Sequence, residues 1–167
     1  LLQGNELIYL SCYLFIFLIL NQLNFFFIGD SGSYSLGLIF GYLLITIHKF
    51  NPNISPFYII LLVWYPCFEI LFSILRKFNI NFSPAKPDIR HLHQLIYNLI
   101  KNKYNFSKLK SNNISSILIL LFNSFSIFLG SVDIYSSQNQ IILIIMNILF
   151  YTAAYKLLVD YKNKTKN

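Results

Sequence analysis

Charged residues are scarce in this 167-residue chain, where Asp, Glu, Lys and Arg together make up 11% of the sequence. A soluble domain carries about 25%. Hydrophobic residues reach 56% and aromatic residues 18%. A soluble domain of this size could not bury that much apolar surface, whereas a lipid bilayer solvates it directly. The composition therefore excludes an ordinary soluble domain and predicts an integral membrane protein.

Cysteine is equally scarce, and both cysteines, Cys12 and Cys67, fall inside apolar runs. They form no disulfide framework, no Cys-x-x-Cys pair and no Cys/His spacing of a metal site, so we interpret them as small membrane-buried side chains. The chain also lacks an initiator Met and a secretory signal pattern at Leu1. We therefore expect it to be a truncated piece of a longer protein.

The apolar residues gather in long runs, and a membrane-spanning helix needs about 20 of them in sequence. The second run is short unless residues 25–28 extend it. The fold class predicted is all-α, an integral membrane bundle of about five transmembrane helices in a single membrane domain over residues 1–167. Buried core helices of a large soluble protein are the disfavoured alternative. The five predicted spans are roughly residues 7–23, 34–47, 57–75, 114–130 and 141–159.

The basic residues are unevenly distributed between the two sides of this bundle. Of the 13 basic residues, Lys49 alone falls on the side opposite the 24–33 turn, the 76–113 loop and the C-terminal tail. Cytoplasmic loops carry the excess of Lys and Arg, so the turn, the loop and the tail are predicted to be cytoplasmic. A nucleic-acid partner is disfavoured, because the basic residues flank membrane spans and form no soluble basic face.

Asp30 lies in FFFIGDSGSYSLG, a segment rich in glycine and serine at a membrane boundary. Glycines allow tight turns and close approach of a ligand. A carboxylate on such a turn suits Mg²⁺, which favours one or two carboxylates together with substrate phosphates. An ordinary turn or helix cap explains the same residues, and the sequence leaves the two readings open.

The 76–113 loop contains SPAKPDIRHLHQLIYNLI, in which an amphipathic helix is predicted after Asp88, with Asp88 as its cap. The basic groups there suit pyrophosphate binding. The alternative, which composition alone favours, is a basic amphipathic helix held by anionic lipid. The two histidines are wrongly spaced for a zinc site, and no third ligand is evident. The polar residues concerned are Lys86, Asp88, Arg90, His91 and His93.

Glu69 lies inside the third apolar run, in WYPCFEILFSILRK. An ionisable group within a membrane is costly and is a functional candidate by default. The preferred interpretation is a structural ion pair with Arg76 or Lys77, whose long side chains can reach along the helix.

These three segments together resemble the polyprenyl-phosphate N-acetylhexosamine-1-phosphate transferases, the membrane glycosyltransferase family that also contains the peptidoglycan phospho-N-acetylmuramoyl-pentapeptide translocase. FFFIGDSGSYSLG is similar to the family's glycine-rich, Asp-bearing motif, and WYPCFEILFSILRK to its Pro-x-x-acid…Arg-Arg/Lys stretch. SPAKPDIRHLHQLIY resembles its cytoplasmic His-x-His-His loop. The motifs occur in the family's order over most of residues 24–100.

The resemblance implies transfer of a sugar-1-phosphate from a UDP-sugar to a polyprenyl phosphate, with release of UMP, at the cytoplasmic face of the inner (plasma) membrane. It implies Mg²⁺ as cofactor, with Mn²⁺ as an alternative, and Asp30 as its ligand. Gln94 departs from the pattern, because many members have a third histidine there. The residues implied to be catalytic are His91, His93 and Asp88, and those implied to bind substrate are Lys86, Arg90, Gln94 and Ser33.

The family's Asp-Asp pair and Asn…Asp-Gly motif do not occur before Asp30. We therefore expect the chain to be the C-terminal half of the enzyme, to be inactive alone and to need the missing N-terminal half as a partner. A non-catalytic membrane scaffold, or a degenerate fragment of the family, is the first alternative. A transporter using Glu69 and Asp30 ranks last, because no internal repeat is evident.

Overall fold

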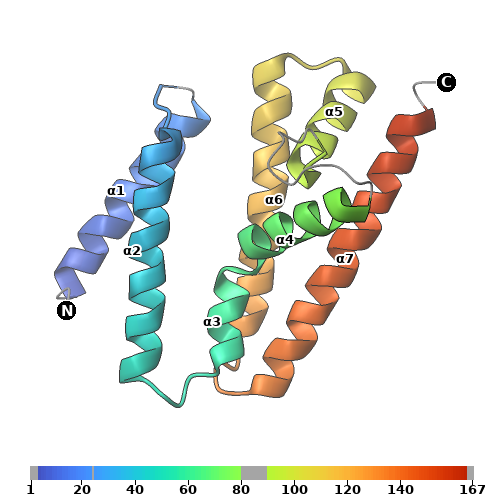
Figure 1. Cartoon of the computed structure of the whole chain (residues 1–167). Coiled ribbons are helices and arrows are strands. Elements are labelled where there is room, and N and C mark those ends of the chain that lie inside the picture. Colours follow the sequence, from blue (N-terminus) through green and yellow to red (C-terminus); the bar gives the residue numbers. More distant parts are fainter. Residues whose placement is uncertain (1–3, 24, 80–89, 165–167) are drawn as a thin grey trace. The chain divides into compact units, whose positions relative to one another are not determined.

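The computed structural model describes residues 4–23, 25–79 and 90–164, and the regular elements in those ranges are all α-helices (Figure 1). The all-α class predicted from the sequence is confirmed for this described part. Seven helices follow one another there: α1 (Gly4–Gln22), α2 (Gly29–Phe50), α3 (Pro56–Leu62), α4 (Trp64–Asn79), α5 (Leu92–Tyr104), α6 (Lys108–Ser131) and α7 (Ser137–Lys164).

The chain divides into two compact units, Leu1–Ile47 and His48–Asn167. The first unit contains α1 and most of α2. The structure describes all of α2, and none of its residues is buried. Large apolar side chains such as Phe15, Leu38 and Ile45 are exposed. Apolar surface on this scale suits contact with lipid or with another membrane protein better than contact with water.

Two helices of the described part, α6 and α7, are long and apolar enough to cross a membrane, and α3 with α4 adds a third if the bent pair counts as one span. The apolar part of α1, Ile8–Gln22, is shorter than a span. Helix α2 has 22 residues, but the Gly/Ser-rich segment at its start dilutes its hydropathy. Membrane association is therefore supported, while the structure supports two or three of the five spans predicted from the sequence.

The third predicted span is broken. The apolar run over residues 57–75 predicts one continuous helix, but the chain bends by 74° between Pro56–Leu62 and Trp64–Phe78. Pro66 gives the physical reason, because proline has no N–H to donate to the Leu62 carbonyl and its ring collides with that carbonyl. The Val63 N–H bonds instead to the Ile60 carbonyl at 3.2 Å, which closes α3 with a tighter turn.

The core of the second unit lies where four helices meet. Helix α3 packs against α6 and α7, and α5 packs against the same two helices. Figure 1 shows α4 leaving the direction of α3 and running across toward α7. Trp64 meets Phe122 edge-to-face at a centroid distance of 5.7 Å, a favoured aromatic geometry. The buried residues at the centre of this cluster are Leu61, Trp64, Leu92 and Tyr151.

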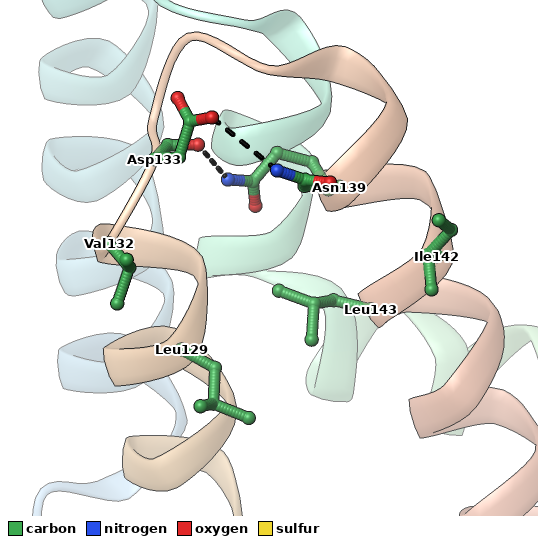
Figure 2. Close-up of a pocket in the computed structure, with 7 residues that line it drawn as sticks. Leu129, Val132, Asp133, Asn139, Ile142 and Leu143 are labelled. Atoms are coloured by element: carbon green, nitrogen blue, oxygen red, sulfur yellow. Dashed lines mark hydrogen bonds between the residues drawn. The ribbon is translucent and has the colours of Figure 1, made fainter.

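The turn between α6 and α7 is ordered by Asp133. Its Oδ1 accepts hydrogen bonds from the backbone N–H groups of Tyr135 and Ser136, both at 3.2 Å. Asn139 donates from Nδ2 to Asp133 Oδ2 at 3.4 Å (Figure 2). Leu129, Val132, Ile142 and Leu143 line the apolar part of a pocket at this turn (Figure 2). Asp133 therefore has a capping role here, which its loop position alone makes reasonable.

Candidate functional site

Glu69 of α4 is buried and lies at a junction of three helices. One carboxylate oxygen, Oε1, lies 2.9 Å from His91 Nδ1 and accepts the Leu92 N–H at 3.2 Å. The other oxygen, Oε2, accepts the Tyr151 hydroxyl at 2.8 Å. The first N–H groups of a helix have no partner within the helix, so a carboxylate beside the start of α5 is stabilised there. The structure pairs Glu69 with His91 of the loop motif, a partner that the sequence did not predict; the partners predicted from the sequence were Arg76 or Lys77.

Helix α5 begins at Leu92, with His91 as its N-cap residue in an extended conformation (φ −70°, ψ 150°). The His91 N–H donates to Gln94 Oε1 at 3.4 Å, the return bond of a capping box. The helix expected after Asp88 is present, but its N-cap position belongs to His91. Asp88 and Lys86 lie outside the described residues. Gln94, expected to bind substrate, has its carbonyl oxygen directed at the start of its own helix.

The apolar face of α5 is covered by protein. Leu92, Leu95 and Ile100 are buried, and the helix packs against α6 and α7. A helix held on anionic lipid would turn this face toward the acyl chains. The packing therefore favours a loop helix fixed to the bundle over a lipid-held amphipathic helix.

The two loop histidines lie side by side. The rings of His91 and His93 stack with centroids 5.7 Å apart and an interplanar angle of 13°. Partial removal from water lowers the pKa of His93 below its ordinary value of 6.5; the Glu69 charge opposes this effect and His91 adds to it. His93 is therefore biased toward the neutral form, in which one ring nitrogen donates and the other accepts.

Arg76, in the last turn of α4, holds the backbone of the residue that precedes the two histidines. Its Nη1 donates to the Arg90 carbonyl at 2.8 Å and to the Tyr155 hydroxyl at 2.6 Å. Its guanidinium carbon lies 5.2 Å from the centroid of the Tyr155 ring, within the range of a cation–π contact. Arg90 itself is exposed. The two arginines give this end of α4 a positive character.

Asp30 and Ser33 belong to the other compact unit. Gly29 has φ +64°, a left-handed conformation that favours glycine, and Asp30 follows in the first turn of α2. The Ser33 hydroxyl donates to the Asp30 carbonyl at 2.8 Å. The exposed Asp30 carboxylate is a hard oxygen donor, so it suits Mg²⁺ completed by water and phosphate oxygens. The described residues contain no cluster of three or more His, Cys, Asp or Glu that could hold a metal.

Sequence reasoning missed three residues of this site, namely Arg76 as an anchor of Arg90, and Tyr151 and Tyr155 as partners of Glu69 and Arg76. The tyrosines are four positions apart, which places them on one face of α7. This spacing of two tyrosines inside an apolar helix is the sequence feature that could have identified them. Tyr151 is fully buried and its ring meets Phe68 edge-to-face at 5.0 Å, so aromatic packing aims its hydroxyl at the carboxylate.

This arrangement can bind an anion and move a proton. A carboxylate-backed imidazole, a second imidazole and two guanidinium groups are the groups that recognise and protonate phosphate oxygens. The sequence matches no protein-family model, and neither a curated protein nor a solved structure matches the chain. The chemistry of the site is therefore argued from its residues.

Proposed function

We propose that this chain forms part of a membrane sugar-1-phosphate transferase. The enzyme would move sugar-1-phosphate from a UDP-sugar, most simply a UDP-N-acetylhexosamine, to polyprenyl (undecaprenyl) phosphate, and so initiate a cell-surface glycan or cell-wall polymer. One observation carries the proposal: His91 Nδ1 and Glu69 Oε1 are 2.9 Å apart although the residues are separated by 22 positions. Two of the motifs behind the resemblance thus meet in one cluster.

The chemistry of the reaction asks for groups of this kind. Phosphoryl transfer depends mainly on positioning and on neutralising charge. In the proposed step, an oxygen of the lipid phosphate forms a bond to the sugar-bearing phosphorus, and the bond from that phosphorus to UMP breaks. His91 takes the proton of the attacking phosphate, while His93 and Arg90 hold phosphate oxygens. Asp30, in the other compact unit, would hold Mg²⁺, whose contribution when bound is Lewis-acid neutralisation of phosphate charge.

The charge distribution supports a site on the cytoplasmic side of the membrane, and the resemblance implies the plasma membrane. Arg76, Lys77 and Lys101 lie in the last turns of α4 and α5, on the loop that the positive-inside rule assigns to the cytoplasm. A UDP-sugar would reach this loop from the cytoplasm, and the lipid phosphate would reach it from the bilayer interface. As a partner we propose an N-terminal half that carries the family's remaining acidic motifs and would complete the site.

The test is UMP release in nanodiscs with undecaprenyl phosphate and a panel of UDP-sugars, with and without Mg²⁺. The chain is assayed alone and together with an N-terminal half that carries the Asp-Asp motif. We expect Mg²⁺-dependent release from the combined halves and a loss of at least about 100-fold in His91→Gln, the scale of general base catalysis. Asp30→Asn should lose the Mg²⁺-dependent release, because it removes a charged ligand of the metal. His48→Gln, at a histidine in the last turn of α2, is the matched control and should stay within about twofold.

Release that survives both substitutions would overturn the assignment of these residues. A folded pair of halves that releases no UMP with any UDP-sugar would favour the non-catalytic scaffold.

One structural observation favours a second candidate, a secondary transporter. The α3–α4 pair is a broken span with a 74° bend, and the buried Glu69 follows the break. Broken helices with ionisable groups are typical of transporter substrate sites. Proton-coupled uptake of a UDP-sugar into proteoliposomes, lost in Glu69→Gln and accompanied by no UMP release, would favour this candidate over the transferase.

A further inference from the structure

Both oxygens of the Glu69 carboxylate are engaged by neighbouring residues. Oε1 contacts His91 Nδ1 and the Leu92 N–H, and Oε2 receives the Tyr151 hydroxyl. The Glu69 side chain is 11% exposed and the His91 side chain 28% exposed. The carboxylate is therefore shielded beneath the imidazole, while the imidazole reaches the surface of the cluster. Glu69 is poorly placed to touch a substrate itself.

The hydrogen-bond roles in this cluster fix the tautomer of His91. A backbone N–H can only donate, so Oε1 already accepts from Leu92. The Tyr151 hydroxyl donates to the second oxygen. An ionised carboxylate only accepts, so the His91 nitrogen facing it must carry a proton. In the neutral imidazole the other nitrogen, Nε2, then has a free lone pair, because the tautomer is set by the hydrogen bond that the first nitrogen makes.

We propose that Glu69 is a positioning residue that holds His91 in the Nδ1–H tautomer, with Tyr151 as the second anchor of its carboxylate. This inference rests on the proposed function, because it gives Nε2 of His91 the task of accepting the proton of the lipid phosphate. In that step the phosphate O–H bond breaks and an Nε2–H bond forms. The Glu69 charge stabilises the imidazolium that results, as carboxylates do behind catalytic histidines in general.

The roles of Glu69 and Tyr151 are separable by substitution. Glu69→Gln retains an amide oxygen that can accept the Nδ1–H, but it removes the negative charge. Glu69→Leu removes the acceptor altogether. Tyr151→Phe keeps the aromatic ring that packs on Phe68 and Phe72 and removes only the hydroxyl. The three variants therefore remove the charge, the acceptor and the second anchor in turn.

The first measurement is independent of enzyme activity. The chain has three histidines, so ¹⁵N-histidine labelling in nanodiscs at pH 8 gives few signals, which His48→Gln and His93→Gln assign. We expect His91 to be protonated at Nδ1 in the wild type and in Glu69→Gln, and to shift toward the Nε2–H form of a free imidazole in Glu69→Leu. A wild-type His91 protonated at Nε2, or a tautomer unchanged in Glu69→Leu, would overturn the inference.

The second measurement separates positioning from a purely structural role. In the two-half UMP-release assay, corrected for the folded fraction, we expect Glu69→Gln to lower kcat about 10- to 100-fold with KM within about threefold, since the proton acceptor loses only its supporting charge. Tyr151→Phe should lower kcat less. A Glu69→Gln protein that unfolds more readily but keeps the wild-type kcat would show that Glu69 only stabilises the fold, and would overturn the inference. A wild type that releases no UMP would overturn the proposed function, while the labelling still decides the Glu69–His91 pairing.

Discussion

Nη1 of Arg76 donates to the backbone carbonyl of Arg90 at 2.8 Å, so the last turn of α4 is tied to the residue that precedes the candidate site. The same nitrogen reaches the Tyr155 hydroxyl. A guanidinium can serve two acceptors and stack on a ring at once, because its donors form a rigid planar fork. The Arg76 side chain thereby joins α4, α7 and the segment that precedes α5.

Replacing Arg76 with Lys should weaken this junction. An ammonium is a point charge on a flexible stem, so it cannot reproduce both hydrogen bonds and the contact with the Tyr155 ring. We expect the free energy of unfolding to fall by about 1–2 kcal/mol, the scale of a hydrogen bond to a charged group. Thermal unfolding in detergent, followed by circular dichroism, measures the change.

The matched control for Arg76→Lys is Lys156→Gln, which alters an exposed cation next to Tyr155 on α7. Its unfolding free energy should stay within about 0.5 kcal/mol of the wild type, as is usual at surface positions. Equal stability of Arg76→Lys and the wild type would contradict the role given to the guanidinium.

Gly130, near the end of α6, should not tolerate a side chain. A Cβ built there collides with Leu61 Cδ2 of α3 and lies 2.9 Å from Gln140 Oε1 of α7. The Gln140 amide cannot move freely, because its Nε2 donates to the carbonyls of Gly130 and Asp133. We expect Gly130→Ala to cost about 1–3 kcal/mol, as overpacking does, and to lower the unfolding temperature.

Gly41→Ala is the control for that substitution, since a Cβ at Gly41 meets nothing within 4 Å. Alanine is also the better helix former by about 1 kcal/mol. Its stability should therefore equal or exceed that of the wild type. Equal effects of the two alanines would show that α3, α6 and α7 do not approach closely at Gly130.

The long helices could be predicted from the sequence, because a long apolar run is a local feature of the chain. The runs at 114–130 and 141–159 lie within α6 and α7, since an apolar run of that length favours a helix whatever surrounds it. The meeting of Glu69 and His91 is a tertiary property. It depends on the direction that α4 takes after the break between α3 and α4, and on which face of α7 carries Tyr151. Neither feature can be predicted from a short stretch of sequence. Pro66 was visible in the sequence, but a proline inside an apolar run is equally compatible with a kinked continuous span.

The stability of the second unit should fall in mild acid because of His93. Its pKa is lowered in the folded state, so the unfolded chain, with the ordinary value near 6.5, binds the proton first as the pH falls. Unfolding then takes up protons, and the free energy of unfolding decreases as the pH drops through 6.5 toward the folded value. Above that range the His93 ring is neutral in both the folded and the unfolded state, so it no longer makes the free energy of unfolding depend on pH.

Unfolding of the wild type and of His93→Gln at pH 8 and pH 5.5 isolates this contribution. Glutamine stays neutral, so the variant should lose less stability than the wild type over the same interval. His91 and Glu69 face His93 in both proteins, so their effects largely cancel in the difference. Identical losses would show that His93 is not desolvated by its neighbours.

Pro66 should be the cause of the 74° bend between α3 and α4. Ile60 and Phe78 are 49% and 62% exposed, so both accept spin labels once Cys12 and Cys67 are replaced by serine. On a straight helix these positions would lie about 27 Å apart, at about 1.5 Å per residue. With the bend near Val63 the bent wild type should give a distance about 3 Å shorter by pulsed electron resonance, and Pro66→Ala should restore the longer distance, because the Leu62 carbonyl regains a donor. Pro56→Ala should leave the distance unchanged, since proline in the first turn of α3 is compatible with a helix. A distance that is insensitive to Pro66→Ala would assign the bend to the packing of Trp64 and the aromatic cluster instead.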